Sequence, residues 1–409
     1  MIFLKEHFFH AARMAARNLY KTWTLKWLYP GRYRHCIRRQ PQQKKKVVFL
    51  EVREQALSDN FRLLWQELER QGDWELILCC IREGMEERKK VRKLCLQAIP
   101  VLADAAVVFI SDSSYFFSSL PLRPQTKVIQ TWHACGAFKK FGYSITDKKF
   151  GADRKDLERF PLHRNFSLVT VSSPEVVWAY AEAFHMEKEQ EKILPVGISR
   201  TDIFYRREFL DSAREKLYEK IPEAGGKKVI LYAPTFRGRV ADAVSPEVLD
   251  FSAMREALAS EYIVLCKHHP FVKHRPAVPE DCQNFAWDAT ELFSIEELLA
   301  VSDVCISDYS SLVFEYSLFE RPMIFLAHDL DEYFDWRGFY YPYCEMAPGP
   351  IVSNTAEVID CIKELPEKFE KERVADFRRK FMSACDGHAT ERILEAAFGR
   401  ETLEKRRKK

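Results

Sequence analysis

Short runs of consecutive apolar residues alternate with longer amphipathic stretches along most of the chain. In the first half these runs occupy 47–52, 74–80, 105–111, 127–132, 168–172 and 192–198. In the second half they occupy 228–233, 262–267, 303–307 and 322–327. Strands that are apolar on both faces are typical of parallel sheets covered by helices. The pattern therefore predicts an α/β protein with two doubly wound parallel-sheet domains.

A helical pattern at 206–220, followed by Gly225-Gly226, separates the two series of strands. We therefore place an N-terminal α/β domain at 47–205 and a C-terminal α/β domain at 206–395, followed by a basic tail at 396–409. Ligands of such sheets bind where strands end in loops, and a cleft between two domains is the natural site. The pattern predicts that the two domains face a common cleft.

Residues 1–46 form a separate, strongly basic segment. They hold twelve Lys and Arg residues against one acidic residue, although the whole chain has a net charge of only +3. A polar stripe recurs at helical spacing and comprises Glu6, His10, Arg13, Arg17 and Lys21, with Leu19 on the opposite face. We interpret this segment as an amphipathic helix that lies on an anionic membrane surface. The alternative is a helix that packs on the first domain and covers its core.

Several protein classes do not fit the sequence. No stretch approaches 18 consecutive apolar residues, so no transmembrane helix is expected, and charges interrupt the N-terminus too often for a signal peptide. The eleven cysteines form no C-x-x-C pair and are interpreted as reduced thiols of a cytosolic protein. The absence of G-x-G-x-x-G and of G-x-x-x-x-G-K-[ST] argues against a classical dinucleotide or P-loop site.

One histidine follows directly after a predicted strand. The run 127–132 leads into His133, and Gly136 lies three residues further on. A histidine at a strand end, beside a glycine that lets a ligand approach, is well placed to act as a general base. The alternative is a histidine whose hydrogen bonds are satisfied within a tight turn.

Three strand ends in the second half carry polar side chains suited to phosphate. The residues at these ends are Thr235, Arg237, His268, His269, Asp308, Ser310 and Ser311. An arginine fork, a histidine donor and the free N–H groups of a helix that begins at Leu312 together resemble a diphosphate cradle. Taken alone, the Ser-Ser pair reads equally as an ordinary helix cap.

The sequence predicts no bound metal and no cofactor. Asp329 and Asp331 have the spacing of a metal-binding pair, but two such carboxylates more often cap or solvate a loop. His268-His269 has no second Cys or His cluster nearby, so zinc is not expected.

Six blocks in order resemble the CDP-glycerol glycerophosphotransferase family of teichoic acid synthesis. They are QTWHACGAFKKFGYS (130–144), LYAPTFRG (231–238), KHHP (267–270), ISDYSSLVFEYSLFERPMIFLAHDLDEYFDWRGFYYPY (306–343), APGPIVSN (347–354) and DGHATER (386–392). The resemblance implies a GT-B fold with His133 and His269 as catalytic residues. It places the donor diphosphate on Thr235, Arg237, Ser310, Ser311 and Arg337. Further candidates from these blocks are Gly136, Asp308, Glu315 and Gly338.

The resemblance also implies the reaction and its partners. Glycerol phosphate, or a related polyol phosphate, would pass from CDP-glycerol to an undecaprenyl-type lipid-linked acceptor with release of CMP. The enzyme would be peripheral on the cytoplasmic side of the membrane and would not strictly require a metal. The sequence departs from the family pattern at Ala134, where glycine is usual, and at Glu315, where aspartate is usual.

Three alternatives remain open on the sequence alone. One is transfer of ribitol phosphate from CDP-ribitol, and another is a GT-B glycosyltransferase that uses a nucleotide sugar, because fold does not fix function. The third is a non-catalytic module that binds nucleic acid or membrane through the basic ends. We favour an enzyme that binds no nucleic acid, because the basic ends lie outside the core that carries the ordered polar loops.

Overall fold

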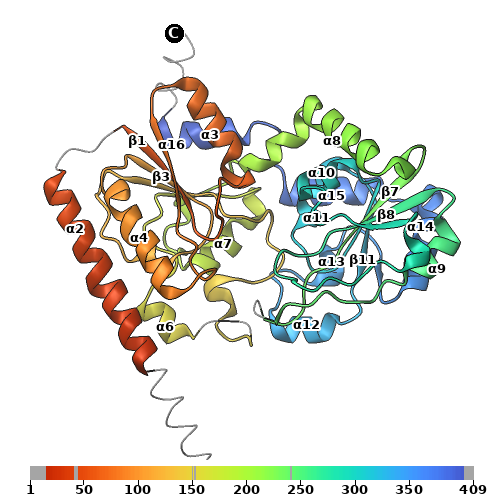
Figure 1. Cartoon of the computed structure of the whole chain (residues 1–409), viewed down its shortest axis with the longest axis horizontal. Helices are drawn as coiled ribbons and strands as arrows, with labels where there is room; N and C mark the ends of the chain where they lie inside the picture. Colours follow the sequence, from red (N-terminus) through yellow and green to blue (C-terminus); the bar gives the residue numbers. More distant parts are fainter. Residues whose placement is uncertain (1–14, 41–44, 150, 152, 240–241, 400–409) are drawn as a thin grey trace, which may run out of the picture.

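The computed structural model describes residues 15–40, 45–149, 151, 153–239 and 242–399. Two parallel sheets of six strands each form two lobes that lie side by side (Figure 1). The first sheet has the order β2-β1-β3-β4-β5-β6. Its strands are β1 (Lys46–Glu51), β2 (Glu75–Cys80), β3 (Val107–Ile110), β4 (Lys127–Gln130), β5 (Leu168–Thr170) and β6 (Ile193–Leu194).

The second sheet has the order β12-β11-β10-β7-β8-β9. Its strands are β7 (Lys228–Ala233), β8 (Tyr262–Cys266), β9 (Ala286–Asp288), β10 (Val304–Ser307), β11 (Met323–Leu326) and β12 (Ile351–Val352). All ten predicted apolar runs contain a strand, so the doubly wound α/β architecture is confirmed. The sequence missed β9 and β12, because Phe285-Ala286-Trp287 and Ile351-Val352 are flanked directly by polar residues or proline, whereas the equally short β5 and β6 lie in longer apolar runs.

Helices cover both faces of each sheet. Those of the first lobe include α3 (Asp59–Gln71), α4 (Arg88–Ala103), α5 (Tyr115–Ser118), α6 (Arg154–Arg159) and α7 (Val177–Phe184). The 3-10 segment η5 (Ser199–Tyr205) leads into the second lobe. There the chain forms α8 (Arg207–Lys220), α9 (Phe251–Leu258), α10 (Ile295–Val301), α11 (Leu312–Tyr316), α12 (Leu330–Trp336), α13 (Tyr343–Met346), α14 (Thr355–Lys368) and α15 (Lys371–Phe381).

Helix α3 illustrates how the sequence determines these elements. Phe61, Leu64 and Leu68 recur at helical spacing and are fully buried against the first sheet. The ring of Phe61 packs edge-on against Phe49 of β1, with the two centroids 5.3 Å apart. The helix ends at Gly72, whose left-handed φ of 70° is readily adopted by glycine.

The last helix, α16 (Ala389–Phe398), returns to the first sheet, where it lies beside α3 (Figure 1). Ile393, Leu394 and Ala397 belong to the same buried cluster as Phe49, and Lys127 Nζ donates to the Ala397 carbonyl at 2.9 Å. The predicted boundary at 395 therefore assigned this helix to the wrong sheet. The apolar face of a helix does not reveal which sheet it covers.

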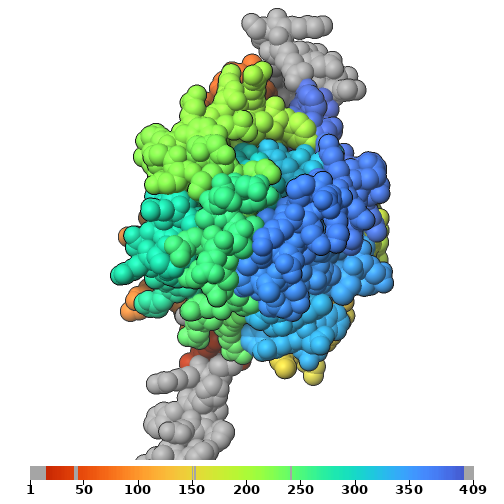
Figure 2. Space-filling view, turned by 90° about the vertical axis from the view of Figure 1, so that its right-hand side faces the viewer, coloured from red at the N-terminus to blue at the C-terminus, as the bar shows by residue number. Residues whose placement is uncertain are grey.

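Figure 2 shows the outer face of the second lobe from the side. C-terminal segments of the chain, in blue, and segments from its middle, in green, cover this face.

The N-terminal helix lies along the edge of the first lobe. It runs through 15–22, continues with the π-helical turn η1 (Trp23–Leu28) and ends with α2 (Tyr29–Arg39). Leu25, Tyr29 and Tyr33 are buried in the first-domain core. The alternative that this segment covers the domain is therefore confirmed for its described part.

The two faces of this helix differ from the predicted ones. Lys21 faces the domain, where its Nζ pairs with Asp156 at 2.6 Å and lies 3.8 Å from the centre of the Tyr115 ring. Leu19, which we expected on the opposite apolar face, is 71% exposed. Lys21 lies four residues before Leu25, so it falls on the same buried face of the helix. Glu6, His10 and Arg13 of the predicted stripe lie outside the described residues. Within the described part of the chain, no helix is both long and apolar enough to cross a membrane.

Candidate active site

A cavity of about 560 Å³ lies between the two domains, at the carboxyl ends of both sheets. Its first-domain wall includes Arg53, Arg82, Ser111, Asp112, His133, Gly136 and Lys139. Its second-domain wall includes Thr235, Phe236, His269, Phe271, Ser310, Ser311 and Arg337. The predicted cleft is therefore present, and it brings His133 together with residues of the three polar strand ends.

The position of His133 fixes which of its ring nitrogens carries a proton. Its Nδ1 lies 3.1 Å from the carbonyl oxygen of Ser111. Because a carbonyl can only accept a hydrogen bond, Nδ1 is protonated and Nε2 keeps its lone pair. Burial in the cleft lowers the pKa of the imidazole, although Asp112, 3.8 Å from Nδ1, opposes the shift. His133 is thus neutral at pH 7 and 45% exposed, as a general base requires.

The turn before His133 is held by a buried glutamine. Trp132 adopts a left-handed φ of 56°, which is uncommon for a bulky residue. Its N–H donates to Gln130 Oε1 at 2.9 Å, and Gln130 Nε2 donates to the Asp112 carbonyl at 3.2 Å. Gln130 therefore fixes the backbone from which His133 projects. Sequence reasoning did not single out Gln130, because it lies inside the predicted strand 127–132.

Arg200, in η5, connects the two domains beneath His133. Its Nη1 donates to the His133 carbonyl at 2.8 Å and to Asn60 Oδ1 at 2.7 Å. Its Nε and Nη2 form a bidentate pair with Glu315 of the second domain, at 2.8 and 2.9 Å. Glu315 is therefore buried in this pair and does not face the cavity with a free carboxylate. Arg200 lies in a connecting segment with no pattern that marks it in the sequence.

Both candidate glycines support contacts between the domains. A Cβ added to Gly136 would lie 2.4 Å from the Phe314 ring of the second domain, and its φ of 60° favours glycine. Gly338, with a φ of 75°, accepts a hydrogen bond from the Lys140 N–H at 3.1 Å through its carbonyl. We expected Gly136 to let a ligand approach, but the neighbour that needs the space is Phe314.

Arg237 uses all five of its N–H donors within the protein. Nε and Nη2 bind Asp329 at 2.5 and 2.9 Å, and Nη2 also binds Asp308 at 3.0 Å. Nη1 donates to the carbonyl and hydroxyl oxygens of Thr235 at 2.8 and 2.9 Å. This corrects the predicted role of Arg237, because no donor remains for a diphosphate. The guanidinium instead ties the loops after β7 and β11 together.

Asp308 and Thr235 belong to the same frame. The Asp308 carboxylate accepts from the Thr235 N–H at 2.8 Å, from its hydroxyl at 2.9 Å and from the Tyr309 N–H at 2.6 Å. Both residues are buried. The predicted contact of Thr235 with the donor is therefore replaced by contacts that fix the end of β7 against the end of β10.

Three basic side chains, Lys139, His269 and Arg337, line one part of the cavity. Burial lowers the pKa of Lys139 to about 7, and the neighbouring Arg337 adds to the shift. Burial also lowers the pKa of His269 to about 4, with Lys139 and Arg337 contributing. Near pH 7 the Arg337 charge and the partly protonated Lys139 can stabilise an anion here, and the neutral His269 adds a hydrogen-bond donor. Lys139 was missed as a site residue, although it stands within the quoted block 130–144.

His269 has the opposite tautomer to His133. Its Nδ1 accepts a hydrogen bond from the Phe271 N–H at 3.2 Å, so the proton of the neutral ring lies on Nε2. The ring packs between Phe236 and Phe271, with centroid distances of 4.7 Å to each. His269 therefore presents a hydrogen-bond donor, whereas His133 presents an acceptor.

Ser310 and Ser311 line the cavity ahead of α11, which begins at Leu312 as predicted. Ser310 Oγ accepts from the Leu312 N–H at 3.4 Å, whereas Ser311 makes no side-chain cap. Because α11 has only five residues, we expect its dipole to contribute little to anion binding. The hydroxyls and the first N–H groups are the useful donors here.

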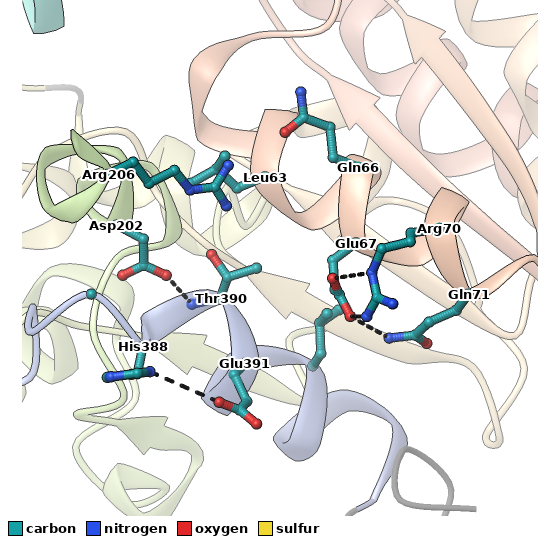
Figure 3. A pocket seen from close by; sticks show the side chains of 12 residues that line it. Leu63, Gln66, Glu67, Arg70, Gln71, Asp202, Arg206, His388, Thr390 and Glu391 are labelled. Carbon is teal, nitrogen blue, oxygen red and sulfur yellow. Dashed lines mark hydrogen bonds and ion pairs between the residues drawn. The ribbon is translucent and has the colours of Figure 1, made fainter. Parts of the chain in front are cut away.

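A second hollow, of about 370 Å³, lies between α3, η5 and α16 (Figure 3). Some of its charged side chains already have partners: Arg70 pairs with Glu67 at 2.6 Å, and Asp202 accepts a hydrogen bond from the Thr390 N–H at 2.7 Å. Among the described residues, no group of three His, Cys, Asp or Glu side chains could hold a metal ion. The interdomain cavity, which brings His133, His269, Ser310 and Arg337 together, is the candidate active site.

Comparisons with known proteins agree with this architecture. The chain is 37% identical to the teichoic acid ribitol-phosphate primase of Bacillus spizizenii, over 87% of this chain and 91% of that protein. It is 30% identical to the teichoic acid glycerol-phosphate transferase of Staphylococcus aureus, over 87% of this chain and 93% of that protein. The solved wall teichoic acid polymerase TagF shares the fold, with a TM-score of 0.75 at 21% identity over 97% of this chain and 98% of that one.

A family model described as "CDP-Glycerol:Poly(glycerophosphate) glycerophosphotransferase" matches residues 33–399. This match confirms the predicted family and enzyme class, and the likeness to TagF confirms the predicted GT-B-like fold. The chain belongs to the CDP-glycerol:poly(glycerophosphate) glycerophosphotransferase family.

Proposed function

We propose that this enzyme transfers glycerol phosphate, or a closely related polyol phosphate, from a CDP-polyol to a lipid-linked acceptor and releases CMP. One observation carries the proposal. His133 offers an unprotonated Nε2 and His269 offers a protonated one, in a single cavity that also holds Lys139 and Arg337. Phosphoryl transfer needs this combination of a base, a donor and fixed positive charge more than it needs covalent help.

The reaction balances as a displacement at the β-phosphorus. The acceptor hydroxyl oxygen forms a new P–O bond, and the bond between the β-phosphorus and the bridging oxygen breaks. Nε2 of His133 takes the hydroxyl proton, and CMP leaves with the electron pair of the broken bond. The Nε2–H of His269 and the charges of Lys139 and Arg337 stabilise the negative charge that develops on the leaving phosphate.

The donor diphosphate would lie against the second-domain wall. Arg337 supplies charge, His269 supplies a donor, and Ser310 and Ser311 supply hydroxyls, while Lys139 adds charge from the first-domain wall. Arg237 holds the frame behind them through Asp308 and Asp329. With this much fixed positive charge, we propose that no metal is strictly required.

Ribitol phosphate is a second candidate for the transferred group. The observation that favours it is the 37% identity to a ribitol-phosphate primase, which exceeds the 30% identity to a glycerol-phosphate transferase. The family description, by contrast, names CDP-glycerol. The test is to incubate the full chain with CDP-glycerol or CDP-ribitol and a lipid-linked acceptor, and to identify the product by mass. CMP release with a polyol-phosphate adduct supports the proposal, and release of CDP with a polyol adduct that lacks the phosphate contradicts it.

We also propose that the N-terminal helix holds the enzyme on the cytoplasmic face of the membrane. On its outward side the residues Leu19, Trp23 and Trp27 are 71%, 47% and 71% exposed to solvent. Basic residues continue along the exposed part of α2, where Arg32, Arg34, Arg38 and Arg39 lie. Exposed tryptophans beside basic residues suit the interface of an anionic bilayer. Because the other side of this helix is part of the domain core, the active site would be held at a fixed orientation to the surface.

A further inference from the structure

The first-domain wall of the cavity carries two arginines that the reaction described above does not use. Arg53 follows β1 and Arg82 follows β2, so both lie at the carboxyl edge of the sheet that carries His133. Apart from Lys139, the proposed donor ligands, which are His269, Ser310, Ser311 and Arg337, belong instead to the second domain. The acceptor must approach His133 from the space left on the first-domain side.

Arg53 is connected to the proposed base through a shared carboxylate. Its Nε donates to Asp112 Oδ2 at 2.5 Å, and that oxygen lies 3.8 Å from His133 Nδ1. The Arg53 side chain remains 43% exposed. Within the residues that the structure describes, neither Nη atom of Arg53 donates a hydrogen bond. One edge of the guanidinium is therefore fixed beside the base, and the other edge remains able to bind a ligand.

Arg82 is held against Arg53 by an uncommon backbone conformation. Its φ of 56° lies in the left-handed region, where a non-glycine side chain is strained. In this conformation Arg82 Nη1 donates to the Arg53 carbonyl at 2.9 Å. Strain of this kind persists where the surrounding structure imposes it, and it is concentrated at functional sites.

Nearby acids only partly neutralise this pair. Glu51 is buried, and its carboxylate accepts from the Ser58 N–H at 2.8 Å and from the Ser111 hydroxyl at 3.3 Å. Asp112 already binds Arg53 and the Ser113 N–H. Glu54 is the acid on this wall that remains exposed, and Arg82 Nε lies 3.6 Å from Glu86. The wall next to His133 is therefore suited to an anion that approaches together with the acceptor hydroxyl.

We propose that Arg53 and Arg82 form an acceptor-phosphate site, which binds a phosphate a few bonds away from the attacking hydroxyl. This inference rests on the proposed function. A hydroxyl at the end of a poly(glycerophosphate) chain lies next to a phosphodiester, so placing that hydroxyl at His133 brings an anion to this wall. The planar fork of arginine matches phosphate oxygens in a bidentate manner. The anion is either the phosphodiester of a polyol phosphate or the diphosphate that joins the acceptor to its lipid.

The test compares acceptors with and without phosphate. We compare the full-length wild type with Arg53→Gln and Arg82→Gln, and we follow CMP release from CDP-glycerol. Each protein is given one of three acceptors: glycerol, glycerol 3-phosphate, or a lipid diphosphate that lacks polyol phosphate. Arg70→Gln is the control, because Arg70 lies on α3 outside the interdomain cavity and pairs with Glu67. We expect Arg53→Gln to lower the ratio of kcat/KM for glycerol 3-phosphate over glycerol by about 10- to 100-fold, the usual range for one charge-assisted contact. Arg82→Gln should lower it less, and Arg70→Gln should leave it unchanged. A selective loss with the lipid diphosphate alone would assign the site to that group.

Two outcomes would overturn the site. An equal loss with all three acceptors would mean that Arg53 acts only through Asp112 on His133, and an unchanged ratio would mean that no phosphate is bound there. Binding of glycerol 3-phosphate to each protein, measured by calorimetry without any donor, separates this inference from the proposed function. If the wild type binds glycerol 3-phosphate and Arg53→Gln does not, the site stands even where no transfer occurs. If the wild type and Arg53→Gln bind glycerol 3-phosphate equally, or if neither binds it, the site is absent whatever the turnover.

Discussion

Arg200 donates a 2.8 Å hydrogen bond from Nη1 to the carbonyl oxygen of His133. The same guanidinium binds Glu315 of the second domain through two hydrogen bonds. The backbone that carries the proposed base is therefore fixed by an ion pair that spans the domain boundary. A change in the arrangement of the domains would move His133 as well.

Breaking this pair should destabilise the protein and slow transfer. Removing one partner of a buried ion pair costs about 3–5 kcal/mol, because the other charge is left buried without its counterion. We therefore expect Glu315→Gln and Arg200→Ala to lower the free energy of unfolding by about that amount in urea denaturation. Arg378→Ala is the matched control, since the Arg378–Glu320 pair is partly exposed and should contribute about 1 kcal/mol or less. Equal losses for the buried and the exposed pairs would contradict this account.

His269 should tolerate glutamine better than alanine. Glutamine places an amide N–H near the position of the imidazole Nε2, whereas alanine removes the donor. Loss of one donor to a developing negative charge typically costs about 10²–10³ in kcat. We expect this loss for His269→Ala and a clearly smaller one for His269→Gln, measured as the rate of CMP release. If both variants lose the same activity, donation from Nε2 is not the role of this side chain.

Binding of the donor should weaken as the pH rises through neutrality. Burial and Arg337 lower the pKa of Lys139 to about 7, so the ammonium that attracts a diphosphate loses its proton above that value. An anion stabilises the charged form, so donor binding near pH 7 should be accompanied by proton uptake. Calorimetry of CDP-glycerol in buffers of different ionisation enthalpy measures this uptake between about pH 6.5 and 8.5. Lys139→Met should bind more weakly and without the uptake. The same uptake in this variant would assign the proton to another group.

Membrane binding should depend on the exposed tryptophans of the N-terminal helix. Deleting the whole helix is a poor test, because Tyr29 and Tyr33 are buried in the domain core. We therefore choose Trp23→Ser with Trp27→Ser, which leave that core intact. Burial of a large apolar side chain contributes about 1.5–3 kcal/mol, so binding to anionic vesicles should fall by at least tenfold. Tyr218→Ser, on exposed α8, controls for the loss of a surface aromatic residue. Unchanged vesicle binding by the double variant would place the membrane contact elsewhere.

Local sequence patterns predicted the features that depend on residues close together in the chain, which are the strands and the positions where they end. The ten apolar runs contain strands, and His133 follows β4, because the sequence itself determines strand periodicity and strand ends. The N-terminal helix also follows this rule. The side of this helix that is buried could not be predicted in this way, because packing against the first domain determines that the stripe from Lys21 to Tyr33 faces inwards.

Long-range partners could not be predicted in the same way. Arg237 reads as a phosphate ligand, yet Asp308 and Asp329, at separations of 71 and 92 residues, take its donors. Arg200 reads as an ordinary linker residue until folding brings Glu315 and the His133 carbonyl to it. The residue types of the site were visible in the sequence. Their division into those that contact substrate and those that hold the frame required the structure.

The central claim is that Nε2 of His133 takes the proton of the acceptor hydroxyl. The most direct measurement compares His133→Ala with the wild type for CMP release and polyol-phosphate product at saturating CDP-polyol and acceptor. We predict that kcat falls by about 10²–10⁴-fold, the usual contribution of a general base, while donor affinity and the unfolding midpoint change little. Turnover near the wild-type value in the folded variant would contradict the claim.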